Sequence, residues 1–324
     1  MDESKRRIVA MRVVWALIAT LSCLQITAFA VLGLIVPWRD ILLIAVGSGI
    51  LLAASFVYVR LRPDERLARL LRAAVELFLL TYLCGGLSYA GASLGRPLWD
   101  ETLLAWDHAL GFDWAAWLAF VDGRPVLAQT LAAAYATLLP QTVLVMLALV
   151  TARRYRALDT FIVAYGLAAF ATIVVAAIMP AVSPLALLNL DPAAYPNTDL
   201  VTPTEVARQV VALRTGHLNL VALSGAQGLV AFPSFHTAGA LLLAAAWRHV
   251  PFLRWPGLAL NAVMLLSVLS VGTHYLVDLL GGLVVAVGSW FSVRAILAVT
   301  TTRVGGPNRV VIRPDSPTEE PLFS

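Results

Sequence analysis

The stretch TFIVAYGLAAFATIVVAAIM, Thr160–Met179, contains no charged side chain. A helix of about 20 apolar residues crosses the roughly 30 Å hydrocarbon core of a bilayer. Because lipid offers the backbone no hydrogen-bond partners, a spanning segment must satisfy its peptide groups internally, as a helix does. The stretch therefore predicts a transmembrane helix.

Similar runs recur along the chain, which is 60% hydrophobic and only 13% charged. Soluble domains are nearer half apolar and a quarter charged. The runs lack the period-two alternation of membrane β-barrels. We therefore predict an all-α, polytopic membrane bundle of about eight helices. The expected spans are Met11–Val36, Ile41–Val59, Leu67–Tyr89, Val126–Val150, Thr160–Met179, Ala231–Trp247, Gly257–Val271 and Tyr275–Val299.

The basic residues are distributed unevenly between the connections. Of the 23 Lys and Arg, 18 fall on the side that holds both termini and five on the other, namely Arg39, Arg96, Arg124, Arg208 and Arg214. Lys and Arg are enriched in cytoplasmic loops. Both termini are therefore predicted to be cytoplasmic, and the net charge of +4 reflects topology, not nucleic-acid binding.

Two connections on the predicted outer side are long. Residues 92–125 contain LWDETLLAWDHALGFDW, whose tryptophans and carboxylates recur at helical spacing, as in an interfacial helix. Residues 181–228 are rich in proline and form a long outer loop, a feature that often carries function. Cys23 and Cys84 lie in apolar runs and are interpreted as buried hydrophobes. The first run is too long for a cleavable signal peptide.

The segment GTHYLVDLLGG places His274 four residues before Asp278 at the predicted outer end of the last span. Residues i and i+4 share one face of a helix. A carboxylate there can bind one imidazole nitrogen, fix the tautomer and leave the other nitrogen for nucleophilic or base chemistry. Alone, a His-x3-Asp pattern is a weak signal.

The segment AFPSFHTAGALL opens the sixth predicted span on the same face. Ser234 suits the N-cap and Pro233 the helix entrance. A helix N-terminus favours phosphate through its free N–H groups and positive partial charge. His236 would thus join His274 and Asp278 beside an anion-binding helix end.

At these residues the chain resembles the type 2 phosphatidic acid phosphatase superfamily, whose signature is Lys-x6-Arg-Pro, Pro-Ser-Gly-His and Ser-Arg-x5-His-x3-Asp. The second part corresponds to Pro233-Ser234-Phe235-His236, and the third runs from Ser267-Val268 to His274 and Asp278. The resemblance implies a six-helix core over 67–299, with two additional N-terminal helices within 1–66. Residues 300–324 are rich in proline, serine and charged side chains, which predicts a disordered tail on the cytoplasmic side.

The chain departs from this signature at its basic positions. Val268 replaces the Arg of the third part, and the first part aligns with Thr172 and Met179-Pro180. The only lysine is Lys5, on the predicted cytoplasmic side. The chain resembles the branch that includes inositol phosphorylceramide synthases at Phe235 after Pro233-Ser234, at Tyr275 after His274 and in the LWDETLLAWDHALGFDW segment. That branch moves a phosphoryl head group between lipids. Arg208 and Arg214 are then the candidate phosphate-binding residues, with solvated loop arginines as the alternative.

The resemblance implies that His274 attacks phosphorus, that Asp278 orients it and that His236 protonates the leaving alcohol. A lipid or polyol acceptor would make the protein a phosphotransferase, and water would make it a lipid phosphatase. We expect a phospholipid substrate at the outer face, with no metal and no cofactor. Other classes remain open: a transporter with a His/Asp relay, which predicts duplicated halves, and a structural protein that has lost activity.

Overall fold

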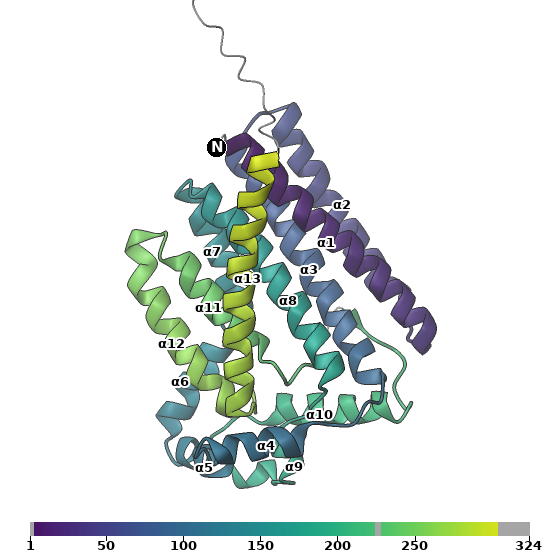
Figure 1. The fold of residues 1–324 in the computed structure, drawn as a ribbon, viewed down its shortest axis with the longest axis vertical. Coiled ribbons are helices and arrows are strands. Elements are labelled where there is room, and N and C mark those ends of the chain that lie inside the picture. Colours follow the sequence, from purple (N-terminus) through teal and green to yellow (C-terminus); the bar gives the residue numbers. More distant parts are fainter. Residues whose placement is uncertain (1–2, 224–227, 304–324) are drawn as a thin grey trace, which may run out of the picture.

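The computed structural model describes residues 3–223 and 228–303. Helices account for nearly all of the regular structure there, and the long helices run side by side as a bundle (Figure 1). The long helices are α1 (Glu3–Leu32), α2 (Trp38–Arg60), α3 (Glu65–Ser93), α7 (Leu138–Thr151), α8 (Tyr155–Ile178), α11 (Phe235–Trp247), α12 (Arg254–Ser270) and α13 (Leu276–Arg303). The predicted all-α membrane bundle is confirmed.

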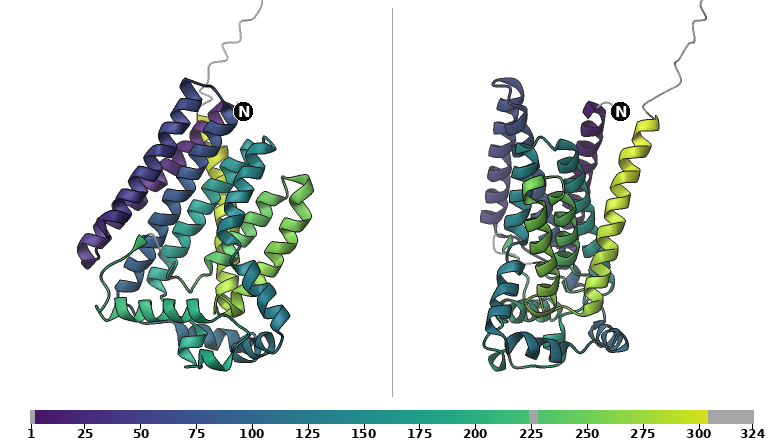
Figure 2. Two further views of the ribbon diagram at one scale, coloured as in Figure 1. Left: turned by 180° about the vertical axis from the view of Figure 1, so that it is seen from behind. Right: turned by 90° about the vertical axis from the view of Figure 1, so that its left-hand side faces the viewer.

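Six helices are long and apolar enough to cross a membrane, namely α1, α2, α3, α8, α12 and α13. Helix α8 lies in the middle, packed against α1, α3, α11 and α13. Half of its most apolar window is buried, compared with 11% for α2, which packs mainly on α3. Helices α2 and α13 lie on opposite sides of the bundle (Figure 2).

The predicted span Val126–Val150 is not one helix. It consists of α6 (Pro125–Tyr135) and α7, which meet at a bend of 53°. Pro140 has no N–H, and its ring would clash with the carbonyl of Ala136 if the helix ran straight through. The same proline is tolerated in the first turn of α7, so the break falls just before it.

The predicted span Ala231–Trp247 is also shorter than expected. Its helix, α11, begins at Phe235 and has 13 residues, which rise about 20 Å. That is less than the roughly 30 Å of a bilayer core. The start of α11 therefore lies within the bundle, at the depth where α13 begins.

Short helices cover the end of the bundle opposite the N-terminus (Figure 1). They are α4 (Asp100–Ala109), α5 (Trp114–Asp122), α9 (Pro184–Leu187), the 3-10 turn η1 (Pro192–Ala194) and α10 (Val201–Arg214). The predicted interfacial segment 92–125 thus contains α4 and α5, and the predicted loop 181–228 contains α9 and α10. At the other end, the 3-10 turn η3 (Pro251–Leu253) joins α11 to α12.

Candidate active site

The connection from α12 to α13 carries His274. Thr273 adopts a left-handed backbone with φ of 48°, which turns the chain sharply before the histidine. The Nδ1 atom of His274 lies 2.9 Å from Oδ2 of Asp278, and the same oxygen accepts the Tyr275 N–H at 3.0 Å. Asp278 is fully buried. This contact occupies Nδ1 and leaves Nε2 as the histidine nitrogen for chemistry.

The start of α11 is joined directly to that of α13. The Ser234 N–H donates to the backbone carbonyl of Asp278 at 3.0 Å, and the Ser234 hydroxyl accepts the Thr237 N–H at 3.3 Å. A methyl group added at Gly281 would lie 2.8 Å from the Pro233 ring. Only a residue without a side chain permits this approach, which brings the two motifs together.

Tyr135, the last residue of α6, stacks on His236. Their ring centroids are 3.9 Å apart and the rings are nearly parallel, at 12°. A Cβ at Gly272 would meet the Cε2 atom of Tyr135 at 2.9 Å and Cδ2 of His274 at 2.8 Å. Tyr135 therefore borders both histidines, and the break between α6 and α7 is what places it there.

Two carboxylates of α4 hold the first residues of α13 and Tyr275, the residue just before it. Asp107 accepts the N–H groups of Leu276 and Val277 at 2.8 and 2.9 Å, which caps the helix. Asp100 accepts the Tyr275 hydroxyl at 2.9 Å and the Val182 N–H at 3.0 Å. Burial raises the pKa of both carboxyls, and these hydrogen bonds oppose that rise. Helix α4 thus fixes the segment that contains His274.

The sequence interpretation did not assign functions to Tyr135, Asp100 or Asp107. The two aspartates are seven residues apart, two helical turns, so the sequence already placed them on one face. What it could not name was their partner, which lies about 170 positions further along the chain. Tyr135 gave no signal, because an aromatic residue in an apolar run is ordinary.

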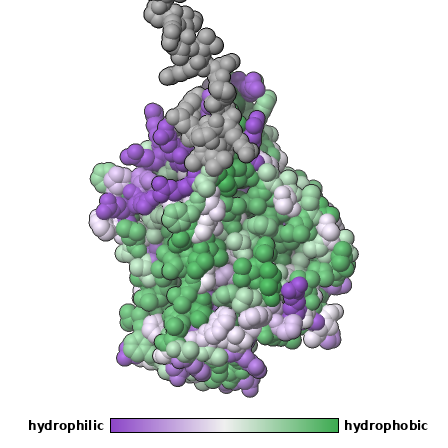
Figure 3. All heavy atoms as spheres, in the orientation of Figure 1, coloured by the Kyte–Doolittle hydropathy of each residue, from purple (hydrophilic) through white to green (hydrophobic). Residues whose placement is uncertain are grey.

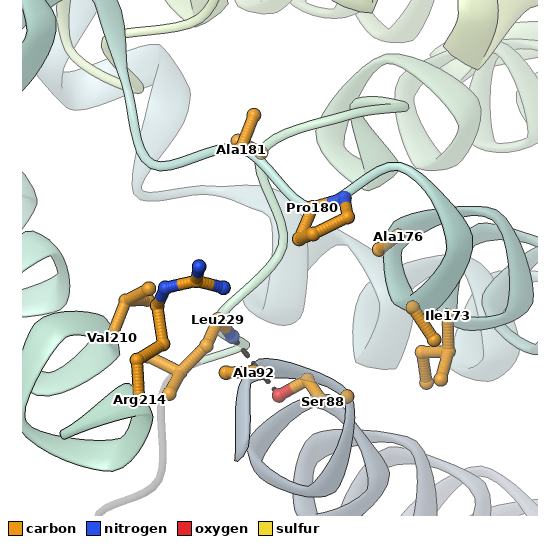
Figure 4. A pocket seen from close by; sticks show the side chains of 12 residues that line it. Ser88, Ala92, Ile173, Ala176, Pro180, Ala181, Val210, Arg214 and Leu229 are labelled. Carbon is orange, nitrogen blue, oxygen red and sulfur yellow. Dashed lines mark hydrogen bonds between the residues drawn. The ribbon is translucent and has the colours of Figure 1, made fainter. Parts of the chain in front are cut away.

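The two predicted phosphate-binding arginines lie on α10 and differ in setting. Arg208 is exposed and pairs with Glu205. Arg214 donates to the Arg96 carbonyl at 2.7 Å and lines a small cavity with Pro180, Ala231 and neighbours (Figure 4). Its buried Nη1 has no hydrogen-bond partner among the described residues. Ala231 is three residues before Ser234, so this cavity lies next to the chain that leads into α11.

Two of the three signature positions that lack a basic residue are buried, and the third, Met179, is half-buried. Val268 is fully buried, and Thr172 is 1% exposed. No cation stands at either position to replace the missing Arg and Lys. Nor does the described part of the chain bring three or more His, Cys, Asp or Glu together as metal ligands would.

A comparison with known families matches residues 101–292 to the PAP2 superfamily, which is more than half of the chain. The chain belongs to the PAP2 superfamily. Members are lipid phosphatases or phosphotransferases, and this protein is a membrane enzyme of that kind. The predicted superfamily is thereby confirmed, and α4 through most of α13 lie within the matched segment. No curated protein and no solved structure matches the chain.

Proposed function

We propose that the protein transfers a phosphoryl head group from a phospholipid to an alcohol acceptor through a phosphohistidine on His274. The observation that carries this proposal is the 2.9 Å contact between His274 Nδ1 and Asp278 Oδ2. A carboxylate on Nδ1 keeps the proton there and leaves the lone pair on Nε2, which is the nucleophilic form of a neutral imidazole.

The proposed reaction has two in-line steps. In the first, Nε2 of His274 forms a bond to phosphorus, the bond from phosphorus to the leaving alcohol breaks, and His236 gives its proton to that oxygen. In the second, the acceptor hydroxyl attacks phosphorus, the phosphorus–nitrogen bond breaks, and His236 takes the hydroxyl proton. Asp278 stabilises the charge on the His274 ring in the intermediate, and the same residues serve both steps.

The transferring phosphoryl group needs positive charge, because its oxygens carry the charge that develops. The backbone N–H groups in the first turn of α11, which follows Ser234, supply part of this positive charge. Arg214 is the stronger of the two candidate arginines, since its Nη1 is buried without a partner in the described structure and its cavity adjoins Ala231. Arg208 is already paired with Glu205 at the surface.

The replacement of all three signature cations, by Thr172, Met179 and Val268, supports a transferase of the inositol phosphorylceramide synthase-like branch over a phosphatase. The residues that support this branch are Phe235 after Pro233-Ser234, Tyr275 after His274, and the α4 segment. In this structure Tyr275 and α4 are in contact, through the Asp100 hydrogen bond. Tyr275 and α4 therefore form one structural unit, which holds the proposed nucleophile.

The test is purified protein turned over with a panel of phospholipids radiolabelled at phosphorus, with and without glycerol or inositol as acceptor. Acid quenching and peptide mapping should find an acid-labile label on His274. His274→Ala should lose all turnover, whereas His236→Ala should still form the labelled intermediate from a donor with a good leaving group. A label on His236, or an active His274→Ala variant, contradicts the assignment.

The acceptor is decided in the same experiment. A transferase passes the label to the added alcohol or to a lipid, and the labelled product grows with acceptor concentration. Release of inorganic phosphate alone, unchanged by any acceptor, would show a lipid phosphatase instead.

A further inference from the structure

A second pocket opens at the other end of the bundle, where the N-terminus lies. It has a volume of about 430 Å³ and is lined by residues of α1, α8, α11 and α13. Four arginines line it: Arg6 of α1, Arg156 of α8, Arg248 just after α11, and Arg294 of α13. His249 completes the polar rim. None of the described residues that line the pocket is acidic.

Topology alone does not require this convergence. The preference for Lys and Arg on one side of a membrane acts on loops, wherever their side chains point. Here the four guanidinium groups border a single hollow, although Arg6 and Arg294 are almost the whole chain apart. Gathering like charges costs energy unless an anion compensates them. Arg6 has Asp159 of α8 nearby, whereas Arg248 and Arg294 form no ion pair within the described part of the chain. Burial lowers the pKa of His249, and neighbouring Arg248 and Arg154 lower it further.

The inner wall of the pocket is apolar. Phe161, Val293 and Leu297 are buried there, and Trp290 lies beneath Arg248, whose guanidinium carbon is 5.3 Å from the ring centroid. Figure 3 shows hydrophilic residues gathered at this end of the molecule, next to a broad hydrophobic face. A ligand seated here would meet cations at the surface and apolar side chains below, between membrane helices.

We propose that this pocket binds the phosphate head group of an anionic membrane lipid, with the first part of the acyl chains against Trp290 and Leu297. Basic pockets between transmembrane helices suit such head groups. Arginine fits them because its planar donor array can bind two phosphate oxygens at once. The site is separate from the histidine pair, at the opposite end of α13, and does not depend on the proposed reaction.

The test uses photoreactive phosphatidylglycerol, with its crosslinker on the acyl chain near the glycerol, in nanodiscs of phosphatidylcholine. Crosslinked peptides are mapped by mass spectrometry, which separates this pocket from the active site. The expected label lies on peptides that contain 245–250 and 290–297. Unlabelled phosphatidylglycerol should compete for it, and inorganic phosphate at the same concentration should not.

Two double variants make the test specific. Arg248→Gln with Arg294→Gln should reduce the label at these peptides on the order of 25-fold, taking about fivefold for each arginine. Arg62→Gln with Arg66→Gln removes two exposed arginines from the same end, outside the pocket, and should leave the label unchanged. All four arginines are exposed, so folding should be preserved, which size-exclusion chromatography checks.

Three results would overturn the proposal. Equal loss in both double variants would show general surface attraction, and full labelling of the Arg248/Arg294 variant would show that the pocket is not used. Competition by inorganic phosphate as effective as by the lipid would mean that the pocket takes a soluble anion.

Discussion

The two ends of the bundle both gather polar groups, but they hold them in opposite ways. At the histidine end, Asp278 is fully buried and its Oδ2 atom binds both His274 and the Tyr275 N–H. At the N-terminal end, Arg248 and Arg294 are exposed and line an open pocket. Fixed, dehydrated contacts suit a reaction that needs one geometry. Arginines with apolar stems and exposed charged ends suit an ionic contact at a membrane surface.

The helices follow the same division. Helix α13 connects both ends. Asp107 of α4 holds its first residue, Leu276, and Asp100 holds the preceding Tyr275, whereas Arg294 near the other end of α13 lines the pocket. If this comparison is correct, conservative changes at the histidine end should impair turnover strongly, and changes at the N-terminal end should barely affect it.

The largest effect among the conservative changes is expected for Asp278→Asn. The amide keeps the shape of the side chain but can hydrogen-bond the wrong tautomer of His274, and the comparable change in a serine-protease triad costs about 10⁴-fold in kcat. The kcat of Asp278→Asn, measured with the most active phospholipid donor of the panel and compared with that of the wild type, tests this expectation. An Asp278→Asn enzyme within tenfold of wild type would show that the pair is only structural.

Arg214 should come next. A charged hydrogen bond contributes about 1.5–3 kcal/mol, so Arg214→Ala should lower kcat/KM by roughly 10–100-fold. Arg208→Ala is the matched control on the same helix, and its pairing with Glu205 predicts a change below about threefold. A larger loss of kcat/KM in Arg208→Ala than in Arg214→Ala would show that Arg208 binds the phosphate. Full activity in both single variants and in the double variant would show that neither arginine does.

Asp107→Asn should have a smaller effect, on the order of tenfold in kcat, because it weakens the cap on α13 without touching the reacting groups. Asp113→Asn is the control, since Asp113 caps α5 through the Ala116 N–H and its side chain makes no hydrogen bond to α13 among the described residues. Thermal unfolding should report a comparable small loss of stability in both variants. Only Asp107→Asn should lose activity, and equal activity in the two would show that the cap does not position His274.

The smallest effect on turnover is expected from Arg62→Cys and Glu101→Cys, exposed positions at the two ends. They serve to test orientation, in a background that lacks Cys23 and Cys84. The charge asymmetry predicts that a membrane-impermeant thiol reagent added to intact cells labels Glu101→Cys and not Arg62→Cys. Labelling of both from the same side would contradict the predicted topology.

The sequence alone determined the membrane bundle, the superfamily and the His274–Asp278 pair, because each depends on local properties. Run length and hydropathy act on one segment at a time. The spacing of four residues predicted the contact correctly, although His274 lies in the connection just before α13 and only Asp278 lies on the helix. The break before Pro140 also has a local cause, the proline itself, although the predicted span ran through it.

Only the tertiary structure decided what surrounds that pair. The stacking of Tyr135 on His236, the capping of α13 by Asp107 and the cavity that Arg214 lines all join residues far apart in the chain. Such contacts depend on how bent and shortened helices pack together, and no local pattern specifies that arrangement. The basic pocket could not be predicted from local patterns either. Its arginines are far apart in the sequence and line one pocket only because α1, α8, α11 and α13 pack together.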